Sequence, residues 1–175
     1  MAGPIDVVSP ASDAEDRSAA FERSVLPLAE RLFRIALAIV DDPGEAEDAV
    51  QETMLSAWRH WASLRDPDSL PAWLTRICVN HCIRRRRLRG RLIFWAPERW
   101  SATAGAEPPG LDGRLLATHR AFQSLSPSQR AMVSLHICDG VSVNECAAFL
   151  GCRPGTARSH LGRALAKLKG GLSHA

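Results

Sequence analysis

Residues 142–169 have the sequence SVNECAAFLGCRPGTARSHLGRALAKLK, from which the helices at the carboxyl-terminal end of the chain can be predicted. Ser142 and Glu145 predict an amino-terminal capping box, so a short helix begins there. Gly151 and Pro154 then predict a tight turn before a longer helix. A short capped helix, a tight turn and a longer basic helix are typical of a helix-turn-helix, which places its second helix in the DNA major groove.

The second helix of this pair has an apolar and a basic face. Apolar residues spaced by four, four and three positions predict its buried stripe: Ala157, Leu161, Leu165 and Leu168. From Cys146 onward the chain has no acidic residue but contains Arg153, Arg158, Arg163, Lys167 and Lys169. A solvated basic helix that only packs on its neighbours is the alternative interpretation. It is less favoured because the cap, the turn and the acid-free stretch occur together, so the sequence indicates duplex DNA as a partner.

Charge is distributed unevenly along the 175 residues. Residues 1–60 contain twelve acidic and five basic residues, whereas residues 61–175 contain seven acidic and seventeen basic residues. This polarity favours a protein partner for the acidic front and nucleic-acid phosphate for the basic remainder.

The amino-acid composition also indicates in which cellular compartment the protein is located. No apolar run approaches the roughly 20 residues that a membrane span needs, so we expect no membrane insertion. The amino terminus lacks the basic and apolar regions of a secretory signal. Five cysteines without a CxxC pair argue against a disulfide framework. We therefore expect a cytoplasmic protein.

Three helices are expected in the amino-terminal half. Residues 1–20 are rich in Pro, Ser, Ala and Asp with little periodicity, so we expect a disordered extension there. Apolar residues spaced by four, three and four positions then mark the buried stripe of a first helix: Leu28, Leu32, Ile35 and Ile39. Pro27 should lie in its first turn or at a break before it. Asp42 as N-cap starts a second helix over residues 44–61, and a third covers residues 69–89.

The composition of residues 91–110 divides the chain into two helical domains. Pro and Gly are frequent there, which predicts a linker between a domain over residues 21–90 and a second domain over residues 111–175. The second domain should contain helices over about 111–125 and 126–140 before the helix-turn-helix. No alternation typical of strands occurs at useful length in the sequence. The predicted fold is therefore all-α, with two small helical domains joined by a flexible linker.

Six of the eight residues from Arg84 to Arg91 are arginine. Such a run alone is more often a nonspecific phosphate patch than a reader of sequence. Here it continues a helix that carries Trp73, Asn80 and His81, and aromatic and amide groups beside positive charge suit unpaired bases. Trp73 itself is more readily explained as a core residue, because it lies in the apolar stripe of that helix.

Cys78, His81 and Cys82 lie on one face of the same helix and could offer three metal ligands. Zinc needs a fourth ligand or an open site, and the other cysteines lie in the second domain. Because cysteine is commonly a small buried apolar residue, we predict no metal and no cofactor. The sequence contains no phosphate-binding glycine loop, nucleophile elbow or plausible catalytic carboxylate pair, so we do not expect an enzyme.

Four segments, in this order, resemble the bacterial RNA polymerase sigma factors. They are AEDAVQE with AWR in residues 46–59, PAWLTRI with Asn80 in residues 71–80, LSPSQR in residues 125–130 and GTARSHL in residues 155–161. The match extends from about Phe21 to Lys169 and comprises two domains without a larger insert, which is similar to the extracytoplasmic-function (ECF) subgroup. The implied fold is a sigma region 2-like domain followed by a region 4-like helix-turn-helix domain.

This resemblance implies three contact surfaces, and an anti-sigma factor as a further partner. One surface would bind the β′ clamp helices of core RNA polymerase, whose β flap would meet the second domain; its residues are Glu47, Asp48, Gln51 and Glu52. A second would engage the minus-ten promoter element through Arg76, Asn80, Arg84, Arg85, Arg86 and Arg87. A third would read the minus-thirty-five element through Arg153, Thr156, Arg158, Ser159, Arg163 and Lys167.

Departures from the family pattern are few and concern the promoter sequence. Asn80 is followed by His81-Cys82-Ile83 without the acid often found there, Pro154 precedes Gly155, and Gly162 replaces a usually polar residue.

Two other function classes remain open at this point. One is an autonomous helix-turn-helix regulator that binds operators without polymerase, and the other is an interaction protein that sequesters a partner. The acidic second helix and the separate basic third helix favour the initiation factor, because a simple repressor requires neither.

Overall fold

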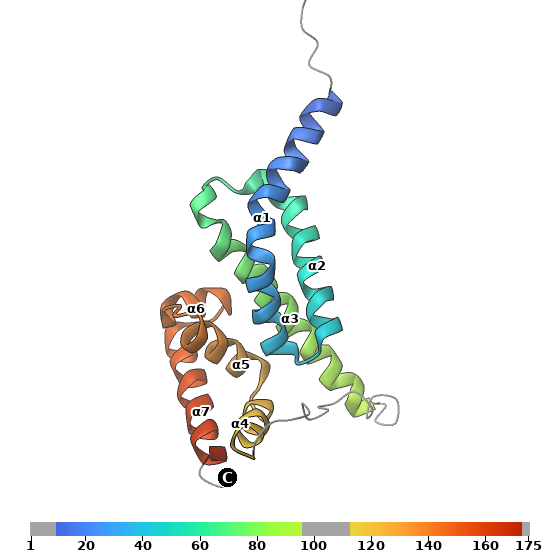
Figure 1. Ribbon diagram of the computed structural model, residues 1–175. Coiled ribbons are helices and arrows are strands. Elements are labelled where there is room, and N and C mark those ends of the chain that lie inside the picture. Colours follow the sequence, from blue (N-terminus) through green and yellow to red (C-terminus); the bar gives the residue numbers. More distant parts are fainter. Residues whose placement is uncertain (1–9, 96–112, 173–175) are drawn as a thin grey trace, which may run out of the picture.

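The computed structural model describes residues 10–95 and 113–172, and the regular elements within these ranges are helical (Figure 1). The first range contains α1 (Pro10–Val40), α2 (Pro43–His60), η1 (Trp61–Ser63), η2 (Pro67–Ser69) and α3 (Leu70–Trp95). The second contains α4 (Gly113–Gln123), α5 (Pro127–Val133), the π-helical turn η4 (Ser134–Cys138), α6 (Val143–Phe149) and α7 (Pro154–Leu172). The predicted all-α class is confirmed. Within the described ranges, no helix combines the length and apolar character needed to cross a membrane.

Side-chain caps begin three helices at the predicted positions. At the start of α2, Asp42 Oδ1 accepts a hydrogen bond of 2.8 Å from the backbone N–H three residues on. Ser126 and Gln129 form a reciprocal capping box at α5, with N···O distances of 2.9 and 3.3 Å. Ser142 and Glu145 form another at α6. Each cap satisfies backbone N–H groups that have no partner within the first helical turn.

The boundaries of α1 and α3 differ from those expected. Because α1 begins at Pro10, residues 10–20 are helical and do not belong to the predicted disordered extension. Pro27 lies inside α1 and not in its first turn or at a break before it. Similarly, α3 continues to Trp95, so residues 91–95 are helical and not linker. The rest of the predicted linker, and residues 1–9, lie outside the described residues.

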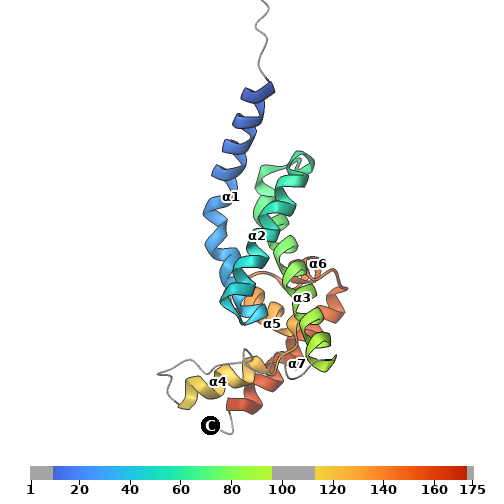
Figure 2. The same ribbon diagram turned by 90° about the vertical axis from the view of Figure 1, so that its right-hand side faces the viewer.

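An aromatic cluster holds the amino-terminal part of α1 against the end of α2. The ring of Phe21 packs edge-on against Trp58 of α2 and Trp61 of η1, with ring centroids 5.2 and 5.1 Å apart. One turn earlier, the Arg17 guanidinium lies 5.0 Å from the centroid of the Trp58 ring. These contacts stabilise the amino-terminal turns of α1, which extend past the other helices in both views (Figures 1 and 2).

The amino-terminal module consists of α1, α2 and α3, and each helix contacts the other two. Of the predicted stripe of α1, Leu32, Ile35 and Ile39 are at most 1 % exposed, whereas Leu28 is only partly buried. The inner face of α2 is lined by small side chains: Ala46, Ala49, Thr53 and Ala57. Their size allows α2 to lie close to α1 and α3, and Leu74 of α3 fills the centre.

The carboxyl-terminal module consists of α4 to α7, with α7 packed across the other three helices. A buried arginine, Arg130, connects α4 to α5. Its Nη2 donates hydrogen bonds of 2.7 and 2.6 Å to the carbonyl and side-chain oxygens of Gln123, and its Nε donates to the Leu125 carbonyl at 3.3 Å. Burial lowers the pKa of Arg130 to about 10.

The two modules pack directly on each other along an interface that we call the seam. It joins α5 and η4 to α1, and α5 and α6 to α3, so buried residues of both modules form one continuous apolar core (Figures 1 and 2). Arg31 of α1 lies 3.0 Å from Asp139 after η4, and its Nη1 also donates to Thr75 Oγ1 at 3.1 Å. Arg130 Nη1 lies 3.9 Å from the Asp41 carboxylate. The sequence had predicted a linker but not this packing.

Two leucines on α1 test this core. Leu32 is 1 % exposed and Leu26 is 65 % exposed. We expect Leu32→Ala to lower the free energy of unfolding by about 2–5 kcal/mol, because it leaves a cavity in the bundle. Leu26→Ala should change it by less than about 0.5 kcal/mol. Urea unfolding monitored by tryptophan fluorescence measures both; equal effects would contradict the packing of α1.

Candidate nucleic-acid interface

The helix α7 buries an apolar face and exposes a basic one. Ala157 and Ala164 are fully buried, and Leu161 and Leu168 are partly buried. Leu165, expected in this stripe, is 37 % exposed, because Ala164 continues the seven-residue repeat that begins at Ala157. The six residues predicted to read the minus-thirty-five element are all exposed: Arg153, Thr156, Arg158, Ser159, Arg163 and Lys167.

A tight turn sets the angle between α6 and α7. Gly151 has a φ of 62°, in the left-handed region that glycine adopts without strain. The backbone N–H of Cys152 donates a 3.0 Å hydrogen bond back to the Ala147 carbonyl, and α7 starts at Pro154. This is the geometry of a helix-turn-helix, with α7 as its outer helix.

Several polar groups of α7 also bond within the module. Ser159 Oγ donates to the Gly155 carbonyl at 3.0 Å, and Arg163 Nε donates to the Ser159 carbonyl at 3.2 Å. Lys167 Nζ donates to the carbonyl of Ser124 at 3.0 Å, which ties this side chain to the end of α4. Lys167 is therefore less free to move toward a ligand than Arg158.

A stripe of polar residues follows one side of α3. Arg76, Asn80 and Arg84 are spaced by four residues and Arg87 follows by three, so the four share one face at about 100° per residue. All four are exposed. We call them the basic stripe. Trp73, seven residues before Asn80, is only partly buried and extends the same side of the helix.

The other two predicted arginines of α3 do not belong to this stripe. Arg85 turns toward α2, where its Nη2 lies 2.8 Å from Asp48 Oδ2 and its Nη1 lies 2.9 Å from Glu52 Oε1. Arg86 turns toward α1 and donates a 2.8 Å hydrogen bond to the Val40 carbonyl. The sequence treated the arginine run as one cationic surface, but the structure divides it among three directions.

The predicted acidic surface lies on α2. Its four residues are exposed, and we call them the acidic face: Glu47, Asp48, Gln51 and Glu52. Leu55 follows on the next turn and is 55 % exposed, so this face also presents an apolar side chain. Sequence reasoning missed Leu55. The sequence could have indicated Leu55, because this residue lies outside the stripe of small residues through which α2 packs on the bundle.

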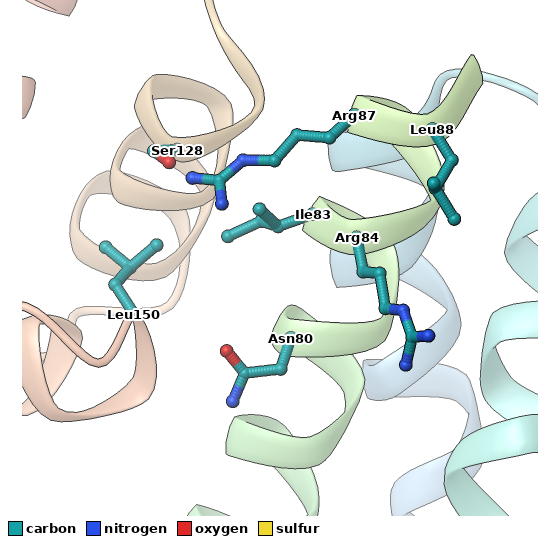
Figure 3. Close-up of a pocket in the computed structure, with 7 residues that line it drawn as sticks. All are labelled: Asn80, Ile83, Arg84, Arg87, Leu88, Ser128 and Leu150. Atoms are coloured by element: carbon teal, nitrogen blue, oxygen red, sulfur yellow. The ribbon is translucent and has the colours of Figure 1, made fainter. Parts of the chain in front are cut away.

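Part of the basic stripe lies in the seam. A cavity of about 270 Å³ lies between α3 and the α5–α6 pair, and Figure 3 shows Arg87 reaching across to the helix that carries Ser128. It is lined by Asn80, Ile83, Arg84, Arg87, Leu88, Ser128 and Leu150. Burial lowers the pKa of His160 on α7, and the positive charges of Arg163 and Arg87 lower it further. The two basic helices therefore lie close together in this arrangement.

The possible metal ligands of α3 are engaged in other contacts. Cys78 and Cys82 are buried in the core, and Cys78 Sγ donates to the Leu32 carbonyl at 3.7 Å. A hydrogen bond with Cys78, together with burial, raises the pKa of the Cys82 thiol. His81 Nδ1 instead lies 3.3 Å from Glu52 Oε2 on the surface. Among the described residues, no group of three or more potential metal ligands gathers.

Two protein-family models match the chain. Residues 25–92 match sigma-70 region 2, which covers most of the amino-terminal module. Residues 115–168 match sigma-70 region 4, which covers most of the carboxyl-terminal module.

The similar proteins and the similar solved structure are also sigma factors. The chain is 32 % identical to an RNA polymerase sigma-E factor of Streptomyces coelicolor over 152 residues, 85 % of this chain and 84 % of that one. It is 34 % identical to the ECF sigma factor SigM of Mycobacterium tuberculosis over 138 residues, 79 % and 69 % of the two chains. A solved structure of the sigma factor RpoE with the anti-sigma factor NepR, from Bartonella quintana, is 29 % identical. It covers 88 % of this chain and 97 % of that one with a TM-score of 0.71.

Thiol labelling tests the placement of the cysteines. Cys138 is exposed, whereas Cys78, Cys82 and Cys146 are buried, and burial raises the pKa of Cys146 to about 11. With iodoacetamide at pH 8 we expect Cys138 to react at least about tenfold faster than the three buried thiols, because thiolate and access both control the rate. Peptide mass spectrometry measures each site. Equal rates in the folded protein would contradict the buried pair on α3.

Proposed function

The chain belongs to the extracytoplasmic-function subfamily of bacterial RNA polymerase sigma factors, and from this premise we propose how its surfaces divide the work of transcription initiation. As a sigma factor, it binds core RNA polymerase and directs it to promoters. The observation that carries the proposal is that three charged surfaces lie on three different helices: the acidic face on α2, the basic stripe on α3 and the basic face on α7. Each suits a different partner.

The outer helix α7 is suited to duplex DNA at the minus-thirty-five element. Its exposed Arg158 and Ser159 lie beside small residues that allow the helix to approach base edges. Arginine can donate two hydrogen bonds to one guanine in the major groove. Arg153, Thr156 and Arg163 flank them, and Lys167 contributes positive charge near the phosphates.

The basic stripe of α3 is suited to the minus-ten element as it opens. Asn80 can hydrogen-bond the exposed edge of an unpaired base, and the partly buried Trp73 offers a ring on the same side of the helix. Arg76, Arg84 and Arg87 would hold the phosphates. Arg85 and Arg86 were predicted to belong to the same group. Their side chains instead contact α2 and α1, so they are less suited to bind DNA.

The acidic face of α2 is suited to the β′ clamp helices of the polymerase. Its exposed carboxylates can pair with basic side chains, and the exposed Leu55 supplies the apolar contact that a specific interface needs. The carboxyl-terminal module would meet the β flap. In this scheme the chain acts in the cytoplasm by binding alone and catalyses no reaction of its own.

Promoter recognition requires the two modules to separate. The minus-ten and minus-thirty-five elements lie about 25 base pairs apart, or roughly 85 Å at about 3.4 Å per base pair. In the packed arrangement Arg87 of α3 is close enough to His160 of α7 to lower its pKa, and Asn80 faces the seam. One chain cannot span both elements in this form.

An anti-sigma factor is a further proposed partner. The matching sigma factor of Bartonella quintana was solved with an anti-sigma factor bound, and CnrH was solved with the cytosolic domain of CnrY, at a TM-score of 0.62. A protein that binds both modules of this chain at once would stabilise the packed arrangement and oppose promoter recognition.

Transcription with purified core polymerase tests the function. Run-off assays on a genomic promoter library should give defined start sites only when the chain is added. The autonomous-regulator alternative, which the family relationship disfavours, predicts tight, sequence-specific DNA binding by the free chain and no dependence on polymerase. Binding measurements with and without core polymerase therefore separate the two.

Substitutions on α7 should separate base contacts from phosphate contacts. Arg158→Ala should reduce the discrimination between a cognate and an altered minus-thirty-five element by about 1–3 kcal/mol, if its contact is bidentate. Lys167→Ala should instead weaken binding to both templates about equally. Competition binding by holoenzyme measures both variants. Unchanged discrimination in Arg158→Ala would remove that residue from the reading surface.

The ion pair across the seam should influence how often the modules separate. Arg31→Ala removes the bonds to Asp139 and Thr75, and we expect the ratio of closed to open chains to fall by up to about fivefold. Glu30→Ala is the control, because Glu30 pairs only locally with Arg34 on the outside of α1. Single-molecule energy transfer between labels on α2 and α7 measures the ratio. Identical ratios in the two variants would contradict this role for Arg31.

A further inference from the structure

Two adjacent arginines of α3 have different surroundings. Arg84 is exposed in the basic stripe and, among the described residues, has no ion-pair partner. The side chain of Arg85 is only 27 % exposed and bridges two carboxylates of α2, at 2.8 Å from Asp48 and 2.9 Å from Glu52. Sequence analysis assigned both arginines to DNA, but this geometry suits only the first.

The ion pairs of Arg85 reduce the repulsion between two carboxylates of the acidic face. Asp48 and Glu52 lie four residues apart on α2, so their carboxylates are neighbours on one side of the helix and repel each other. The planar guanidinium of Arg85 offers one nitrogen to each carboxylate, which a lysine ammonium cannot do with the same fixed geometry. His81, one turn earlier on α3, lies 3.3 Å from the second oxygen of Glu52.

The bridged carboxylates remain accessible to a partner. The side chains of Asp48 and Glu52 are 57 % and 48 % exposed, and each carboxylate can accept more than one hydrogen bond. Arg85 occupies Asp48 Oδ2 and Glu52 Oε1, so Asp48 Oδ1 is not used by this bridge. A basic side chain of another protein can therefore join the cluster without displacing Arg85, whereas a DNA phosphate would have to compete with two carboxylates for it.

We propose that Arg85 is a positioning residue of the polymerase-binding surface and not a DNA-binding residue. It holds Asp48 and Glu52 in one orientation, so that less side-chain freedom is lost when polymerase binds. The inference rests on the proposed role of the acidic face. Within the arginine run it assigns polymerase binding to Arg85 and promoter DNA to Arg84.

Matched glutamine variants of the full chain test this division. We expect Arg85→Gln to weaken binding to core polymerase by about fivefold, while holoenzyme assembled at saturating concentration binds promoter DNA with at least half of its normal affinity. Arg84→Gln should show the opposite pattern, losing promoter affinity but not core affinity. Arg23→Gln, an exposed charge on α1 that bonds its own helix, is the neutral control. Fluorescence anisotropy with labelled chain and with labelled promoter measures the two affinities.

A double-mutant cycle separates positioning from general destabilisation. If Arg85 acts through the carboxylates, Arg85→Gln should have little further effect on core affinity in an Asp48→Asn/Glu52→Gln background. Arg85→Lys, which keeps the charge but not the planar fork, should fall between wild type and Arg85→Gln. A loss that persists in that background would overturn the proposal, since a merely structural role predicts it.

Two further results of these affinity measurements would overturn the proposal. Unchanged core affinity in Arg85→Gln, or a loss of promoter affinity like that of Arg84→Gln, would overturn the assignment of Arg85 while leaving the sigma-factor function intact. If the wild-type chain bound no core polymerase, the proposed role of the acidic face would fail, and this inference with it.

Discussion

The packing of α3 against α1 and α2 determines where each of its charged side chains can point. Leu74, Cys78 and Cys82 are buried on one side of α3. Because successive residues of a helix are rotated by about 100°, this burial fixes the direction in which each neighbouring side chain points. Four consecutive arginines therefore occupy different environments. Arg85 meets the carboxylates of α2, and Arg86 meets the end of α1, whereas Arg84 and Arg87 remain on the exposed stripe.

In the proposed scheme, this division separates the surface that binds polymerase from the surface that binds promoter DNA. The seam adds a second constraint, because it brings the basic stripe and α7 together and buries apolar surface shared by both modules. Separating the modules exposes that surface to water, which is unfavourable. We propose that polymerase and promoter contacts made only by the separated form offset this cost, so that the partners shift the population toward separated modules.

Comparison of sequence and structure shows which features are local. The capping boxes at Ser126 and Ser142 were predicted because their partners lie three residues away in the chain. The early start of α1 was missed because residues 10–20 show little apolar periodicity, and the contacts of Arg17 and Phe21 join this part of the helix to tryptophans far along the sequence. On α7, the single-position error that placed Leu165 in the core reflects a repeat that Ala164 satisfies equally well by spacing.

The helical class, the helix-turn-helix, the sigma-factor family and the division into acidic and basic segments could all be predicted from the amino-acid sequence. These follow from short-range spacing, turn chemistry and composition, which do not depend on distant contacts. The contacts of each arginine on α3 and the way the modules meet became visible in the folded chain alone. An ion pair such as Arg85 with Asp48 joins residues on different helices, and its formation depends on how those helices rotate when their apolar faces are buried.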